Sequence, residues 1–207
     1  MRTGIKKIYF ATGNKQKIER MQSLCHLIAD DFHVEPMPDL IPVEENGETP
    51  IDNAILKVSP YRDLDAPIIA GDTGLYFDDM VCYPTHVKRT AIEDKGKKVE
   101  DCSQDEIYSI MLEYYKNLAV KHGGEFPFYF LDGWAFKSVH GNLKTFLNKR
   151  ENILTSLPQG EKQLYFPMCN LYKSRITGKY YTQWTEEDML NELVGQKEML
   201  EEIYEML

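Results

Sequence analysis

The chain has 207 residues, 43% of them hydrophobic and 28% charged, which is the composition of a folded protein and argues against disorder. Its formal net charge of −9 argues against a nucleic-acid partner, since such a surface does not attract a polyanion over long range. No apolar run approaches the roughly 20 residues of a membrane helix, and the apolar stretch at the start is too short for a signal peptide. We therefore expect a cytoplasmic protein with no membrane partner.

The first predicted element is a strand at residues 5–10, which ends in the turn of residues 11–14. From Lys15 the apolar residues recur at helical spacing, so the turn opens a helix. A helix N-terminus after a strand binds phosphate through its free N–H groups and its dipole. The candidate phosphate-binding residues are Thr12, Gly13, Asn14 and Lys17. The alternative is an Asn-capped helix with a solvated lysine, because this motif alone is weak.

After a predicted strand at residues 32–37, an acidic loop carries Glu44 and Glu48. Pro50 then suits the first turn of a helix that reaches about Lys57. Two carboxylates near a lysine can hold Mg²⁺ and neutralise a triphosphate. Taken by itself, a solvated acidic loop before an amphipathic helix explains the same residues.

A short buried strand is predicted at residues 67–70, stopped by Gly71-Asp72-Thr73-Gly74. A carboxylate at the end of a buried strand suits metal binding or activation of water. The flanking glycines would let a ligand approach the backbone. The alternative is that Asp72 hydrogen-bonds its own turn.

The second half alternates one long helix with consecutive strands. Residues 91–101 are expected to form a loop, and Ser103 with Glu106 forms a capping box for a helix to about Lys121. The strands are expected at residues 126–130, 134–139, 143–147, 152–157 and 164–168, followed by helices that begin near Thr185 and Gln196. Strand–helix units followed by consecutive strands indicate an α/β fold with helices on a mixed sheet.

Three segments, taken together and in this order, resemble the inosine triphosphate pyrophosphatase family. They are YFATGNKQK, then EENGETPIDNAILK, then GDTGL at residues 71–75. The family hydrolyses non-standard purine nucleoside triphosphates to monophosphate and pyrophosphate. The resemblance is specific over residues 5–80.

The resemblance implies roles for individual residues. Thr12, Asn14, Lys17 and Lys57 would contact the triphosphate, with Thr73 beside the substrate; Glu44 and Asp72 would hold Mg²⁺ or Mn²⁺, and Asp72 would also activate water. It further implies a homodimer, and an elongated mixed sheet in one domain (residues 1–207) with two lobes and an active-site cleft between them.

The chain departs from the family in two places. Gly71 stands where the family usually has an acidic residue, which could weaken metal binding. The Ser-His-Arg motif and the aspartate that hold the base in the family have no counterpart here. The nearest segment offers the aromatic residues Tyr165 and Phe166 instead, and Trp134 or Trp184 is a further candidate for stacking on the base. Stacking on such rings or a place in the core explains them equally well. The rival interpretation is a nucleotide-binding regulatory protein that has lost turnover.

Overall fold

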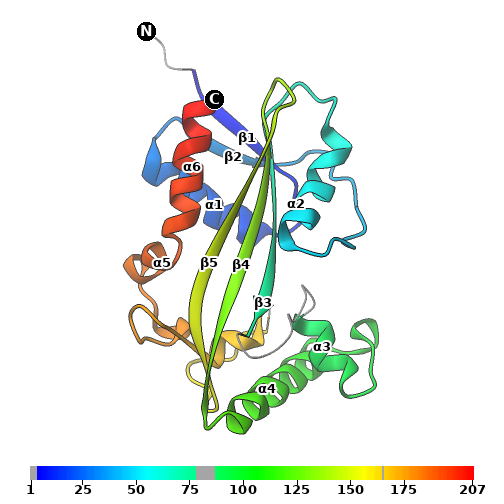
Figure 1. Ribbon diagram of the computed structural model, residues 1–207, viewed down its shortest axis with the longest axis vertical. Helices are drawn as coiled ribbons and strands as arrows, with labels where there is room; N and C mark the ends of the chain where they lie inside the picture. The colour runs from blue at the N-terminus through cyan, green and yellow to red at the C-terminus, as the bar shows by residue number, and fades with distance from the viewer. Residues whose placement is uncertain (1–3, 78–86, 165) are drawn as a thin grey trace. The chain divides into compact units, whose positions relative to one another are not determined.

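The computed structural model describes residues 4–77, 87–164 and 166–207. The chain divides into two compact units. Unit 1 comprises residues 1–73, 131–148 and 193–207, and unit 2 comprises residues 74–130 and 149–192. The six strands follow the order β2-β1-β3-β4-β5-β6, which is the mixed sheet that the sequence predicted (Figure 1).

Unit 1 contains the parallel part of the sheet. The strand β1 (Lys6–Phe10) pairs in parallel with β2 (Phe32–Pro36) and with β3 (Ile68–Tyr76). The helix α1 (Lys15–Ile28) connects β1 to β2. Because ligands bind at the carboxyl ends of parallel strands, the turn after β1 is the expected place for a site.

The helix α2 (Pro50–Val58) covers β3 on the other side from α1, and its inner residues pack on alanines of β3 and β4 (Figure 1). A close backbone contact makes this packing possible. A Cβ atom at Gly133, in the β4 strand, would lie 2.4 Å from the backbone nitrogen of Ile51. Glycine at position 133 therefore lets α2 lie directly against the sheet, which brings Asn53 and Lys57 to β3.

The C-terminal helix α6 (Val194–Met206) completes unit 1 by packing against α1 (Figure 1). Lys6 Nζ donates to the carbonyl of Tyr204 at 2.7 Å, and the Tyr204 hydroxyl bonds Asp31 at 2.9 Å. These bonds join α6 to β1 and to the residue that precedes β2. In residues 4–77, 87–164 and 166–207, no helix combines the length and the hydrophobicity needed to cross a bilayer.

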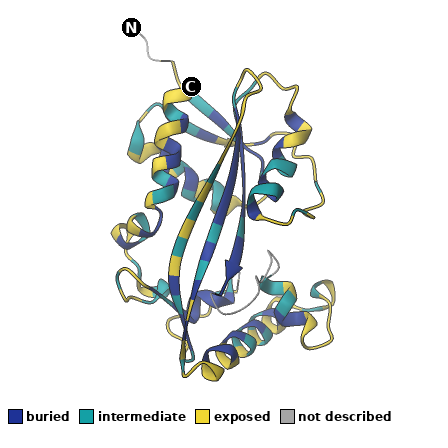
Figure 2. Cartoon of the chain, viewed as in Figure 1, coloured by how far each residue is buried: buried dark blue, intermediate teal, exposed yellow. Residues whose placement is uncertain are grey.

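Unit 2 is built around the long helix α4 (Gln104–Lys121), whose capping box between Ser103 and Glu106 is present as predicted. Its helices are completed by α3 (Val87–Glu93), α5 (Glu186–Glu192) and 3-10 turns at Val99–Asp101, Pro167–Asn170 and Tyr181–Gln183. Its strands are β6 (Tyr172–Ser174) and parts of β4 (Glu125–Lys137) and β5 (Leu143–Thr155), which unit 1 shares. A further 3-10 turn, at Ser59–Tyr61, follows α2 in unit 1. An aromatic-rich core fills unit 2, and one face of α4 is buried in that core (Figure 2).

Several predicted boundaries are wrong. The strand at 67–70 does not stop at Gly71 but runs on to Tyr76, so Asp72 lies inside it. The four predicted strands between 126 and 157 are two long ones. The expected loop at 91–101 contains the end of α3 and a 3-10 turn, and residues 167 and 168, expected in a strand, begin another such turn.

Candidate functional site

A pocket of about 450 Å³ lies within unit 1 at the carboxyl end of β1. It is lined by Ala11, Thr12, Gly13, Asn14, Lys17, Leu40, Ile41, Pro42, Val43, Glu45, Lys57 and Asp72. The three segments that carried the family resemblance therefore meet in one place. Of the predicted site residues, the pocket collects six: Thr12, Gly13, Asn14, Lys17, Lys57 and Asp72.

The turn after β1 shapes one wall of this pocket. Asn14 caps α1, because its Oδ1 accepts from the backbone nitrogen of Lys17 at 3.2 Å. The Thr12 hydroxyl accepts from the backbone nitrogen of Asn14, also at 3.2 Å. The capped helix that was the alternative interpretation is thus present, and it opens directly at the pocket. An N-terminus in this position favours an anion through the helix dipole.

Lys17 supplies positive charge from the first turn of α1. Its half-buried side chain lines the pocket together with Lys57. Burial, and next the charge of Lys57, hold the pKa of Lys17 below its ordinary value, while Asp72 and Asp132 act in the opposite direction. Two ammonium groups that repel each other in one pocket favour a polyanion between them.

Lys57 reaches across the pocket from α2 to two carboxylates. Its Nζ lies 2.8 Å from Glu45 Oε2 and 3.5 Å from Asp72 Oδ1. It also lies 3.4 Å from the carbonyl oxygen of Gly71. The shorter distance identifies Glu45 as the closer partner. One lysine and two carboxylates, with a net charge of −1, are therefore the charged centre of the site.

Asn53 fixes the orientation of Asp72, and this role was missed in the sequence. Its Nδ2 donates to Asp72 Oδ2 at 2.9 Å, while its Oδ1 accepts from the backbone nitrogen of Gly47 at 2.8 Å. Asn53 is fully buried, so both of its bonds are shielded from water. With Oδ2 engaged, Asp72 presents Oδ1 towards Lys57. The asparagine of the NAILK segment was the available signal for this role.

Two predicted residues lie outside the lining of the described pocket. Glu44 is exposed, and its neighbour Glu45 faces the pocket instead. The Thr73 hydroxyl donates to Asp132 Oδ1 at 2.7 Å. Asp132 is fully buried and also accepts from Gln196 Nε2 at 3.3 Å. Thr73 is therefore bonded on the face of β3 opposite to Asp72, because successive side chains of a strand alternate between faces.

The structure explains why position 71 is a glycine, which the sequence did not. A Cβ atom at this position would lie 2.5 Å from two ring carbons of Trp134. The indole is buried, with 3% of Trp134 exposed. The glycine therefore makes room for the indole. A second ring, that of Tyr76, lies in the same way against Gly74.

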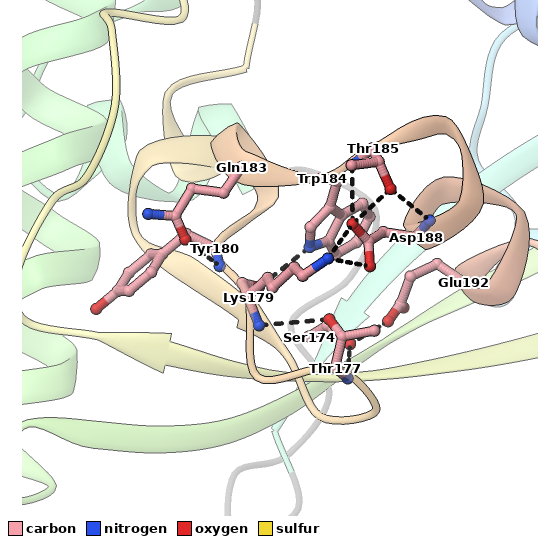
Figure 3. Close-up of polar contacts among 9 residues, drawn as sticks. All are labelled: Ser174, Thr177, Lys179, Tyr180, Gln183, Trp184, Thr185, Asp188 and Glu192. Atoms are coloured by element: carbon pink, nitrogen blue, oxygen red, sulfur yellow. Dashed lines mark hydrogen bonds and ion pairs between the residues drawn. The ribbon is translucent and has the colours of Figure 1, made fainter.

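Three of the aromatic residues proposed to stack on the base come from the C-terminal part of the chain. Tyr165 lies outside the described residues. Phe166 packs against the core of unit 2, with its ring 6.3 Å from that of Phe130. Trp184, also in unit 2, donates from Nε1 to the carbonyl of Lys179 at 3.0 Å (Figure 3). Phe166 and Trp184 thus have packing roles within unit 2.

The polar residues around Trp184 also bond one another. Lys179 Nζ contacts both oxygens of Asp188, at 2.9 and 2.8 Å, and Ser174 donates to Glu192 (Figure 3). The Lys179 bond and then the Thr185 N–H lower the pKa of Asp188 to about 2, whereas burial raises the pKa of Glu192. This network joins β6 to α5 and stabilises the C-terminal part of unit 2.

The pocket's donor set fits a magnesium ion. Mg²⁺ is bound by one or two carboxylates together with substrate phosphates, and it does not require an all-protein cage. Glu45 and Asp72 supply two carboxylates. Within the part of the chain that the structure describes, no group of three or more His, Cys, Asp or Glu side chains could hold a metal alone. A metal here would therefore be completed by the phosphates of a ligand.

The chain is similar to known proteins in sequence and in fold. The model of the Ham1 family matches residues 8–116, more than half of the chain. The fold is shared with the Ham1 protein of Staphylococcus aureus (TM-score 0.71, 21% identity, covering 97% of this chain and 98% of that one). It is shared with a HAM1 protein from Coxiella burnetii (TM-score 0.71, 18% identity, 98% and 100% covered).

A third similar structure is a nucleoside-triphosphatase / dITP/XTP pyrophosphatase from Mycobacterium abscessus (TM-score 0.63, 16% identity, 95% and 98% covered). At these identities the structures show a common fold, and the family match adds the sequence relationship. The α/β fold and the family resemblance predicted from the sequence are both confirmed. The chain belongs to the Ham1 family.

Proposed function

We propose that this protein is a metal-dependent nucleoside triphosphate pyrophosphohydrolase that releases a nucleoside monophosphate and pyrophosphate. The observation that carries the proposal is the pocket in unit 1, where a capped helix N-terminus, two lysines and an oriented aspartate converge. Membership of the Ham1 family and the similarity to the M. abscessus dITP/XTP pyrophosphatase support the same reaction. By resemblance, the substrates are non-standard purine nucleotides such as ITP, dITP or XTP.

In the proposed reaction, a water molecule attacks the α-phosphorus and the bond to the bridging oxygen breaks. The electron pair of that bond leaves with pyrophosphate. Asp72 orients the water and accepts its proton, held in place by Asn53. Lys17 and Lys57 clamp the phosphates, and the N–H groups at the start of α1 bind the same anion. The protein mainly positions the reactants and stabilises charge.

Mg²⁺ or Mn²⁺ bound by Asp72 and a carboxylate of the acidic loop would neutralise the charge that develops on the phosphate oxygens. The resemblance assigned Glu44 to this loop position, and Glu45 is the residue that lines the pocket. The ion would arrive with the nucleotide, because Mg²⁺ sites use substrate phosphates as ligands.

A panel of nucleoside triphosphates tests this proposal. Each is incubated with and without Mg²⁺ or Mn²⁺, and pyrophosphate and orthophosphate are measured separately. We expect at least one triphosphate to give equal amounts of monophosphate and pyrophosphate, only when metal is present. Orthophosphate as the primary product would refute the position of cleavage.

The same panel tests base selectivity. A pocket that distinguishes a 6-keto purine from adenine needs polar groups aimed at the base, and their loss costs large factors. The family's Ser-His-Arg motif is missing here. We therefore expect kcat/KM for ITP to exceed those for ATP and GTP by less than about 100-fold. A larger preference over both would show that other residues of this chain read the base.

A nucleotide-binding protein without turnover is the second candidate. It is favoured by Trp134, whose ring fills the space where a side chain at Gly71 would lie. A glycine therefore stands where the family usually has an acidic residue. Nucleotide binding without hydrolysis across the panel would support this candidate.

A further inference from the structure

The charged centre of the pocket already contains a cation of its own. Lys57 Nζ is surrounded by three oxygens: Glu45 Oε2 at 2.8 Å, Gly71 O at 3.4 Å and Asp72 Oδ1 at 3.5 Å. The Lys57 and Asp72 side chains are largely buried, with 16% and 11% exposed, whereas 42% of the Glu45 side chain is exposed. Two carboxylates and a carbonyl are also the hard oxygen ligands that Mg²⁺ and Mn²⁺ prefer.

We propose that Lys57 and a divalent cation exchange at this oxygen cluster, with the metal taking the carboxylates of Glu45 and Asp72 while Lys57 turns to the polyphosphate. This inference rests on the proposed function, and it adds Glu45 as a site residue. Lys57 is then the counterion of the empty pocket and a phosphate clamp of the loaded one.

Electrostatics give the direction of the exchange. An ammonium group and a divalent cation cannot share two carboxylates without strong repulsion at separations of a few ångströms. In the nucleotide-free protein Lys57 therefore competes with the metal and weakens its binding. A triphosphate relieves the competition, because its negative oxygens attract Lys57 and also ligate the metal.

Lys57 has a short path to the phosphates. It lies on α2 and lines the same pocket as Lys17 and the turn after β1. The helix itself is held in place by its capping box at Thr49 and by its contact with Gly133. In the proposed exchange the Lys57 side chain moves while the helix stays in place.

The test is the binding of Mn²⁺ alone, without nucleotide, measured by electron paramagnetic resonance of free Mn²⁺. We expect Lys57→Met to lower the Kd for Mn²⁺ at least about 10-fold relative to the wild type, since a repelling charge is removed. Lys57→Gln should do the same, and serves if the methionine variant fails to fold. Lys57→Arg keeps the charge and should change the Kd less than about 3-fold. Unchanged or weaker Mn²⁺ binding in a folded neutral variant would overturn the exchange.

Two adjacent glutamates provide a matched pair for the carboxylate assignment. Glu45→Gln, made in the Lys57→Met background, should weaken Mn²⁺ binding about 10-fold or more, because a charged ligand is lost. Glu44→Gln should have a clearly smaller effect, because Glu44 does not line the described pocket. The reverse order of the two effects would overturn the role of Glu45. These measurements need no turnover, so they can fail while pyrophosphate release is observed, or succeed in a protein that does not hydrolyse nucleotides.

Discussion

Asp72→Asn is expected to lower kcat for the best nucleoside triphosphate by at least about 100-fold, the low end of the contribution of general acid–base catalysis. The substitution preserves the shape of the side chain but removes the charge that orients water and metal. Its oxygen can still accept the bond from Asn53, so the fold should be kept. Steady-state kinetics with Mg²⁺, together with circular dichroism, measure the two consequences.

Asp63→Asn is the matched control for this substitution. Its side chain is 91% exposed, so neither activity nor stability should change measurably. If folded Asp72→Asn keeps nearly full activity, Asp72 does not orient the water, and the chemistry lies elsewhere.

Lys17→Ala should instead raise KM, because a phosphate clamp acts in the ground state as well as in the transition state.

Gly71→Ala is expected to destabilise the protein by about 1–3 kcal/mol, because the new methyl group would overlap the ring of Trp134 in a packed interior. Trp134→Ala removes that ring and leaves a cavity, which should itself cost about 3–5 kcal/mol. In the Trp134→Ala background the methyl group has room, so Gly71→Ala should cost much less. We expect the two substitutions to be non-additive by at least about 1 kcal/mol, as measured by urea unfolding.

Gly13→Ala is the control for the glycine substitution. The added Cβ at position 13 would have Leu40 Cδ2 as its nearest neighbour beyond the adjacent residues, at 3.5 Å, which is an ordinary contact. The free energy of unfolding should therefore change by no more than about 0.5 kcal/mol. Simple additivity of Gly71→Ala and Trp134→Ala would show that the cost of the new methyl group does not come from the ring of Trp134. In that case the missing carboxylate at position 71 would need another explanation.

Helix caps and helix periodicity could be predicted from the sequence because the residues that interact in them are close together in the chain. The capping box at Ser103 and Glu106 joins residues three apart, as does the cap of Asn14 on Lys17. The apolar periodicity that predicted α1 reflects a buried stripe of Met21, Leu24 and Cys25. These features depend on helix geometry alone, which explains why most helix positions were predicted correctly.

The errors occur where a distant partner decides the structure. Gly71 looked like the end of a strand, but its place inside β3 depends on the ring of Trp134, which comes from another strand. Thr73 is oriented by Asp132 of β4, which in turn bonds Gln196 of α6. No pattern of neighbouring residues in the sequence predicts such contacts.

The site itself was predictable to the level of its segments. The family motifs identified the segments that contain Lys17, Lys57 and Asp72, and the structure brings these residues together in unit 1. Which of two adjacent glutamates faces the pocket depends on the course of an irregular loop. The course of this loop is set in part by the hydrogen bond from the Gly47 backbone nitrogen to Asn53 Oδ1. No sequence pattern predicts that bond.

The most direct test of the proposed reaction is hydrolysis in ¹⁸O-labelled water, with the products analysed by mass spectrometry. Attack on the α-phosphorus places one ¹⁸O atom in the nucleoside monophosphate and none in the pyrophosphate, and this is the result that we expect with Mg²⁺ present. A label in the pyrophosphate would mean attack on the β-phosphorus, and labelled orthophosphate with a nucleoside diphosphate would mean attack on the γ-phosphorus. Either of these results would contradict the proposed roles of Asp72 and of the pocket in unit 1.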